Sequence, residues 1–122
     1  MDDFTMMPRA NCAVDATMSV IEGRWKTVIL CKLHVNGPMR FNQLMKSIGG
    51  VSPRILTKQL KEMESDGIIR RTSYQEIPPR VEYSLTGKGE SLGPILKAMA
   101  EWGLRNMFPN RVTFDPEIKM EE

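Results

Sequence analysis

The sequence predicts a mainly α-helical domain with one small β-hairpin, an α+β fold. Apolar residues recur at helical spacing over most of the 122 residues, alternate with polar ones around residues 69–85, and are separated by glycine and proline turns. The length fits one domain with a hydrophobic core. We expect this domain at residues 12–108, between a flexible N-terminal tail (1–11) and a polar C-terminal tail (109–122).

Two helices are expected before the Asn-Gly-Pro turn at residues 36–38. Val14, Met18 and Ile21 share one face of the first helix. Asn11 is its expected N-cap, because an asparagine side chain can accept from the free amides of the first turn. Residues 25–33 repeat the helical spacing and predict the second helix.

A short helix, a tight turn and a longer helix are expected next. Residues 41–48 have helical spacing, and the turn is Gly49-Gly50. Ser52-Pro53 then starts the longer helix, because serine caps the amides and proline at the first helical position loses no hydrogen bond. Its expected buried stripe is Leu56, Leu60 and Met63.

The spacing then changes to that of a strand. Val81, Tyr83 and Leu85 alternate with polar residues, and residues 69–75 are the expected partner strand. Pairing should lapse at the tip, because Pro78 and Pro79 cannot donate to a ladder. Thr86 is the expected cap of the last helix, in which Gly93-Pro94 predicts a kink or a restart.

This order of elements predicts a winged helix-turn-helix, with the hairpin as the wing. Arg54, Lys58 and Lys61 share the outer face of the fourth helix, the expected recognition helix. Arg54 lies in its first turn, from which an arginine fork can reach guanine O6 and N7, whereas the lysines suit phosphates. The expected contacts to double-stranded DNA are Arg40, Ser52, Arg54, Thr57, Lys58, Lys61, Arg71 and, at the wing tip, Arg80.

The charge distribution agrees with a polyanionic partner. The net charge is only +2, but residues 24–80 hold eleven Lys/Arg against four Asp/Glu, a net +7. The remaining residues are therefore net acidic. A basic middle of this kind favours nucleic acid over a merely solvated basic surface once it coincides with a recognition helix.

Other classes of function have little support in the sequence. No long apolar run predicts a membrane span, and no secretory signal opens the chain, so we expect a cytoplasmic protein. His34 is the one histidine, and we expect no metal site, cofactor or catalytic motif. The sequence therefore does not predict an enzyme. Cys31 is interpreted as a small core residue.

Five segments of the chain also resemble one known family. They are Cys12-Ala-Val-Asp-Ala-Thr, Ile21-Glu-Gly-Arg-Trp-Lys, Arg40-Phe-Asn-Gln-Leu, Ser52-Pro-Arg-Ile-Leu-Thr-Lys-Gln-Leu and Pro79-Arg-Val-Glu-Tyr-Ser-Leu-Thr. Together they resemble the HxlR family of bacterial winged-helix transcription regulators. The resemblance covers about residues 12–103.

The resemblance implies a cytoplasmic homodimer that binds inverted-repeat operators, with the first and last helices at the dimer interface. Transferred to this chain, the interface is Val14, Met18, Ile21, Leu92, Ile95, Leu96, Met99 and Trp102. The last helix also has more apolar surface than a small domain can cover, which is typical of an interface. Some family members sense oxidants or electrophiles through an N-terminal cysteine, which makes Cys12 a candidate redox sensor, with an inert interface cysteine as the alternative.

The sequence therefore predicts a sequence-specific DNA-binding transcription regulator, with a repressor expected over an activator. The alternative is a winged-helix protein-interaction module that presents its basic face to an acidic protein. A regulator that responds to a small-molecule effector differs from the first hypothesis only in its signal.

Overall fold

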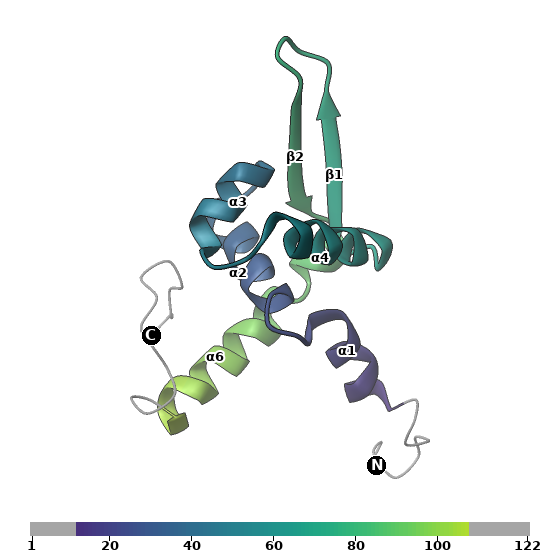
Figure 1. Cartoon of the computed structure of the whole chain (residues 1–122). Coiled ribbons are helices and arrows are strands. Elements are labelled where there is room, and N and C mark those ends of the chain that lie inside the picture. Colours follow the sequence, from purple (N-terminus) through teal and green to yellow (C-terminus); the bar gives the residue numbers. More distant parts are fainter. Residues whose placement is uncertain (1–11, 108–122) are drawn as a thin grey trace.

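The computed structural model describes residues 12–107 and confirms the predicted fold class, a winged helix-turn-helix. Within these residues, four helices precede one antiparallel hairpin and two follow it (Figure 1). The predicted tails at 1–11 and 109–122 lie outside the described residues. The elements in chain order are α1 (Ala13–Ile21), α2 (Lys26–Asn36), α3 (Phe41–Ile48), α4 (Pro53–Ser65), β1 (Ile69–Tyr74), β2 (Arg80–Leu85), α5 (Gly87–Glu90) and α6 (Gly93–Met107).

The start of α1 differs from the prediction. Its N-cap position is Cys12, whose side chain makes no capping hydrogen bond, rather than Asn11. Asn11 itself lies outside the described residues. The later start places Asp15 in the first turn of α1, where a carboxylate is favoured by the positive end of the helix dipole.

The start of α4 is the one that the sequence predicts. The hydroxyl of Ser52 accepts a hydrogen bond from the amide of Ile55 at 3.1 Å, and Pro53 occupies the first helical position. A serine N-cap of this kind stabilises a helix by about 1 kcal/mol. The cap fixes the register of α4 and therefore which of its side chains face outward.

One hydrophobic core joins the helices to the base of the hairpin. Leu56, Leu60 and Met63 of α4 are at most 1 % exposed and supply one wall of this core. Burial of a side chain of this size contributes about 1.5–3 kcal/mol. The other core residues are Ile21, Ile29, Leu30, Leu33, Met39, Leu44, Val51, Ile68, Ile69, Leu92 and Leu96.

The hairpin stands on this core as a long wing. Its register pairs Ile69 with Leu85 at the base and Tyr74 with Arg80 toward the tip. The predicted short strand near residue 39 is a single bridge, in which Met39 and Tyr83 exchange backbone hydrogen bonds of 2.9 and 2.8 Å. This bridge ties the wing to the segment that enters α3.

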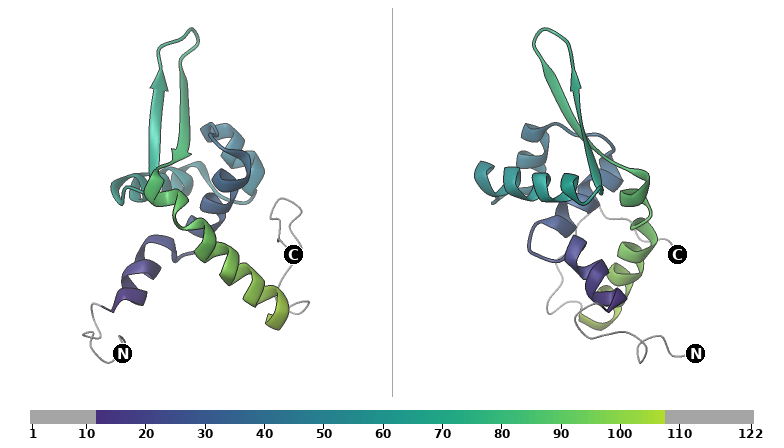
Figure 2. Two further views of the ribbon diagram at one scale, coloured as in Figure 1. Left: turned by 180° about the vertical axis from the view of Figure 1, so that it is seen from behind. Right: turned by 90° about the vertical axis from the view of Figure 1, so that its right-hand side faces the viewer.

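The last helix is interrupted, as Gly93-Pro94 predicts. Thr86 caps the short helix α5 by accepting from the amide of Gly89 at 3.1 Å, and α6 then begins at Gly93. The Thr86 hydroxyl also donates to the carbonyl of Gly67 at 2.6 Å. The restart redirects the chain, so that α6 leaves the body on the side opposite the wing (Figures 1 and 2).

Both α1 and α6 project from the body as separate arms (Figures 1 and 2). Only Ile21 is buried in α1, and only Leu96 is buried in α6. Short isolated helices are marginally stable in water and gain most of their stability from packing. Most of the surface of these two helices is therefore uncovered in the single chain.

Candidate nucleic-acid interface

The outer face of α4 is a row of exposed basic side chains. Arg54, Lys58 and Lys61 are all exposed, and they lie opposite the buried stripe of the same helix. At a rise of 1.5 Å per residue the row is about 10 Å long. This length and charge match a helix that lies in the major groove with its ends near phosphates.

Ser52 and Thr57 each carry a hydroxyl group near the start of α4, and the two hydroxyl protons differ in availability. The Thr57 hydroxyl donates to the carbonyl of Pro53 at 2.8 Å, so its proton is already used within the helix. The Ser52 oxygen accepts from Ile55, so its own proton is still available to a phosphate oxygen. Both residues are exposed, as a contact with DNA requires.

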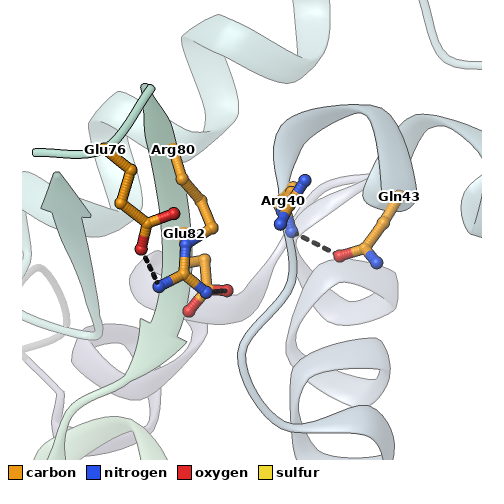
Figure 3. Close-up of polar contacts among 5 residues, drawn as sticks. All are labelled: Arg40, Gln43, Glu76, Arg80 and Glu82. Atoms are coloured by element: carbon orange, nitrogen blue, oxygen red, sulfur yellow. Dashed lines mark hydrogen bonds and ion pairs between the residues drawn. The ribbon is translucent and has the colours of Figure 1, made fainter. Parts of the chain in front are cut away.

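Arg40 is the N-cap residue of α3, the first of the two motif helices. Its amide donates to the side-chain oxygen of Gln43 at 2.8 Å, which satisfies one free amide at the start of α3 (Figure 3). The residue as a whole is exposed. Its backbone is therefore held while its guanidinium lies at the surface, which suits a phosphate contact.

The wing presents its two predicted arginines differently. Arg71 lies in β1 opposite Tyr83 and is exposed. Arg80 is half-buried, and its guanidinium is shared by Glu76 at 2.7 Å and Glu82 at 3.0 Å (Figure 3). The guanidinium of Arg80, an expected DNA contact of the wing tip, therefore lies between two carboxylates of the wing in this structure.

The sequence reasoning missed an apolar side chain on the recognition face. Ile55 follows Arg54 and is 36 % exposed. An apolar side chain at this place on a recognition helix suits the methyl group of thymine. Its helical spacing could have revealed it, because Ile55 falls outside the stripe of Leu56, Leu60 and Met63.

The rear of α4 carries an ion pair that the sequence did not predict. The Lys26 ammonium lies 3.0 Å from a carboxylate oxygen of Glu62, and only 11 % of the Lys26 side chain is exposed. The hydrogen bond and the charge of Lys26 hold the pKa of Glu62 below its ordinary value of 4.5. The pair connects α4 to the start of α2.

The apolar residues expected at the dimer interface separate into two groups. Ile21, Leu92 and Leu96 are at most 9 % exposed and belong to the core of the single chain, so most of their surface is already covered without a partner. The rest of the predicted set is accessible: Met18 is half-buried, Val14 is 49 % exposed, Ile95 42 %, Met99 47 % and Trp102 62 %.

The remaining candidates lie away from the α4 row. Cys12, at the N-cap of α1, and Cys31, within α2, are both half-buried. His34 is half-buried in the last turn of α2, beside Gly93. In the part of the chain that the structure describes, no three His, Cys, Asp or Glu residues gather as metal ligands would. No helix within residues 12–107 has the length and apolar character needed to cross a membrane.

Comparison with known proteins agrees with this geometry. The model of the HxlR-like helix-turn-helix family matches residues 20–111. The chain is 42 % identical over 112 residues to the uncharacterized HTH-type transcriptional regulator YtcD of Bacillus subtilis, covering 92 % of this chain and 86 % of that protein. It is 47 % identical over 90 residues to the uncharacterized HTH-type transcriptional regulator BH0655 of Halalkalibacterium halodurans, covering 74 % and 80 % of the two chains.

A solved structure is similar as well. The redox regulator HypR in its reduced form superimposes with a TM-score of 0.75 at 41 % identity, covering 80 % of this chain and 95 % of that one. The family match spans most of the chain, and its boundaries include the helix-turn-helix, the wing and α6. The chain thus belongs to the HxlR-like helix-turn-helix family of transcriptional regulators.

Proposed function

We propose that this protein binds operator DNA as a homodimer and represses transcription, with α4 in the major groove. The observation that carries the proposal is the exposed row of Arg54, Lys58 and Lys61 opposite a fully buried stripe. A helix held rigidly from behind and basic in front suits sequence reading at its first turn. A regulatory rather than catalytic role, in the cytoplasm where operator DNA lies, is part of this proposal.

The contacts divide by chemistry. Arg54 donates its fork to a guanine edge, and the Thr57 methyl and Ile55 contact thymine methyl groups. Phosphate oxygens are bound by Lys58 and Lys61 and by the residues that flank the motif, Arg40, Ser52 and Arg71. Base contacts give sequence preference, whereas phosphate contacts fix the position of α4 on the duplex.

The homodimer follows from the uncovered arms. Ile95, Met99 and Trp102 recur at i, i+4 and i+7, so they form one apolar stripe on α6, and Val14 is the exposed apolar residue of α1. A second copy of the chain offers the same stripe, and self-complementary contacts of this kind make two-fold dimers. Two recognition helices related by a two-fold axis would read an inverted repeat.

A redox signal through Cys12 is part of the proposal. Cys12 is the N-cap residue of an arm that we place at the dimer interface, and HypR, to which the chain is similar, is a redox regulator. Oxidation of Cys12 would change how α1 packs on its partner and, with it, the spacing of the two α4 helices.

The experiment that tests DNA binding is fluorescence anisotropy with the DNA upstream of the protein's own coding region and with random DNA, at two salt concentrations. We expect tighter binding to the upstream DNA, and affinity that falls steeply with salt as counterions are released. Absence of binding to both DNAs at low salt would favour the winged-helix protein-interaction module. If both DNAs bind equally, a selection from random sequences decides whether another operator exists.

A further inference from the structure

The wing tip, residues 74–82, carries an internal charge cluster. One nitrogen of the Arg80 guanidinium donates to Glu76 at 2.7 Å and another donates to Glu82 at 3.0 Å (Figure 3). The guanidinium also stacks on the ring of Tyr74, with its carbon 4.0 Å from the ring centroid. Hydrogen bonds between a guanidinium and a carboxylate are stronger than those between neutral groups. The Arg80 guanidinium is therefore held by two carboxylates at its edge and by an aromatic ring on its face.

Little of the Arg80 side chain remains open to another anion. It is 27 % exposed, and its Nε atom is buried without a hydrogen-bond partner among residues 12–107. Glu82 is the more enclosed carboxylate, with 19 % of its side chain exposed, whereas 49 % of the Glu76 side chain is exposed. A phosphate that approaches from solvent therefore has to displace Glu76 first.

The rest of the tip is also poorly suited to phosphate. Ile77 is fully exposed at 102 % and apolar, and the two prolines that follow have no amide proton to donate. Within residues 74–82 the single cation, Arg80, is accompanied by two carboxylates, so the segment is net −1. A net negative tip is repelled by the phosphate backbone.

We propose that Glu76 restrains non-specific DNA binding by holding Arg80 away from phosphate. This inference rests on the proposed function. Non-specific affinity depends on how many phosphates the protein neutralises, whereas sequence preference comes from base contacts of α4. A wing whose cation is already neutralised makes one phosphate contact fewer, so that binding to random DNA is weaker and depends more on the contacts of α4. Glu76 is thus a positioning residue that acts through Arg80.

The test measures the salt dependence of binding to random DNA and to the selected operator. Glu76→Gln keeps the shape of the side chain and replaces the carboxylate with a neutral amide oxygen, which weakens the hold on one side of the Arg80 fork. We expect tighter binding to random DNA, by about fivefold at 0.15 M salt, and a slope of log affinity against log salt that steepens by about one contact. Glu22→Gln makes the same charge change at the exposed C-cap of α1 and should leave both quantities unchanged.

Two further variants separate the inference from its alternatives. The single variant Arg80→Met should have the same salt slope as the parent. In the double variant, Arg80→Met should abolish the tighter binding to random DNA and the steeper salt slope that Glu76→Gln produces. A slope that falls by about one in Arg80→Met would show that Arg80 already binds phosphate and would overturn the inference. So would a Glu76→Gln variant that behaves like Glu22→Gln while the parent still prefers its operator. If the parent binds no DNA at all, the proposed function itself fails.

Discussion

A carboxylate oxygen of Glu62 lies 3.0 Å from the ammonium of Lys26, so that an ion pair joins α4 to the first residue of α2. The helix that we place in the major groove is therefore braced from behind near its C-terminal end. The N-terminal end is held by the Ser52 cap. Both ends of the recognition helix are thus fixed by contacts within the chain.

Replacement of Glu62 by glutamine should make the free energy of unfolding less dependent on pH. Since Lys26 lowers the pKa of Glu62 in the folded chain, the pair stabilises the fold above the unfolded value of 4.5, and this stabilisation is lost as pH falls through the folded pKa. The parent should be more stable than Glu62→Gln at pH 7, and the difference should close below pH 4.5. Urea unfolding across this range measures it. A difference that is the same at pH 7 and at pH 3 would contradict the ion-pair account.

A methyl group at Gly89 should disrupt the junction between the wing and α5. A Cβ atom there would lie 2.2 Å from the backbone carbonyl oxygen of Ile68, which cannot move without displacing β1. We expect Gly89→Ala to reduce the free energy of unfolding by about 3 kcal/mol or more, at the upper end of overpacking effects. Gly87→Ala, two residues earlier with nothing within 4 Å of the added atom, is the control and should change it by less than about 0.5 kcal/mol. Equal effects of the two variants in thermal unfolding would argue against this close approach.

Arg54 should determine the sequence preference of α4, whereas Lys58 should contribute to the affinity for any DNA. Arg54→Ala should weaken operator binding by about 1–3 kcal/mol and reduce discrimination between operator variants, because it removes a base contact. Lys58→Ala should weaken all DNA similarly and lower the salt slope by about one. Anisotropy titrations with operator and mismatched DNA compare the two. Two variants that both bind operator like the parent would place the recognition face elsewhere.

The apolar stripe of α6 should hold the dimer together. Trp102 is 62 % exposed in the single chain, and tryptophans of this kind are often the residues on which an interface depends most. Trp102→Ala should raise the dimer dissociation constant by about tenfold or more, as measured by analytical ultracentrifugation. Val35→Ala removes exposed apolar atoms from α2, where Val35 is 45 % exposed, and should leave the dimer intact. A parent that sediments as a monomer at micromolar concentration would refute the homodimer.

Cys12 should account for any response to oxidants. Treatment with a thiol oxidant should change the operator affinity of the parent severalfold and be reversed by a reductant. Cys12→Ser should not respond, whereas Cys31→Ser, which keeps the N-cap cysteine, should respond like the parent. An unchanged response in Cys12→Ser would assign the signal to another group.

Several local features of this fold are predictable from neighbouring residues. The Ser52-Pro53 start, the stripe of Leu56, Leu60 and Met63, and the restart at Gly93 depend on residues close together in the chain. Spacing and capping chemistry therefore predicted them, along with the outward face of α4. The cap of α1 was placed one residue too early, because Asn11 and Cys12 precede the same helical pattern and only the start at Ala13 puts Asp15 in the first turn.

Which side chains are accessible depends on how the elements pack together. Ile21, Leu92 and Leu96 share the helical spacing of their exposed neighbours, and their place in the common core distinguishes them from the surface. Likewise, Arg80 has the sequence position of a DNA contact, but the folded wing places its guanidinium between Glu76 and Glu82. Periodicity reports which way a side chain points along its own element. What that side chain meets depends on the folded conformation of the loops and on the packing of the elements, which periodicity does not report.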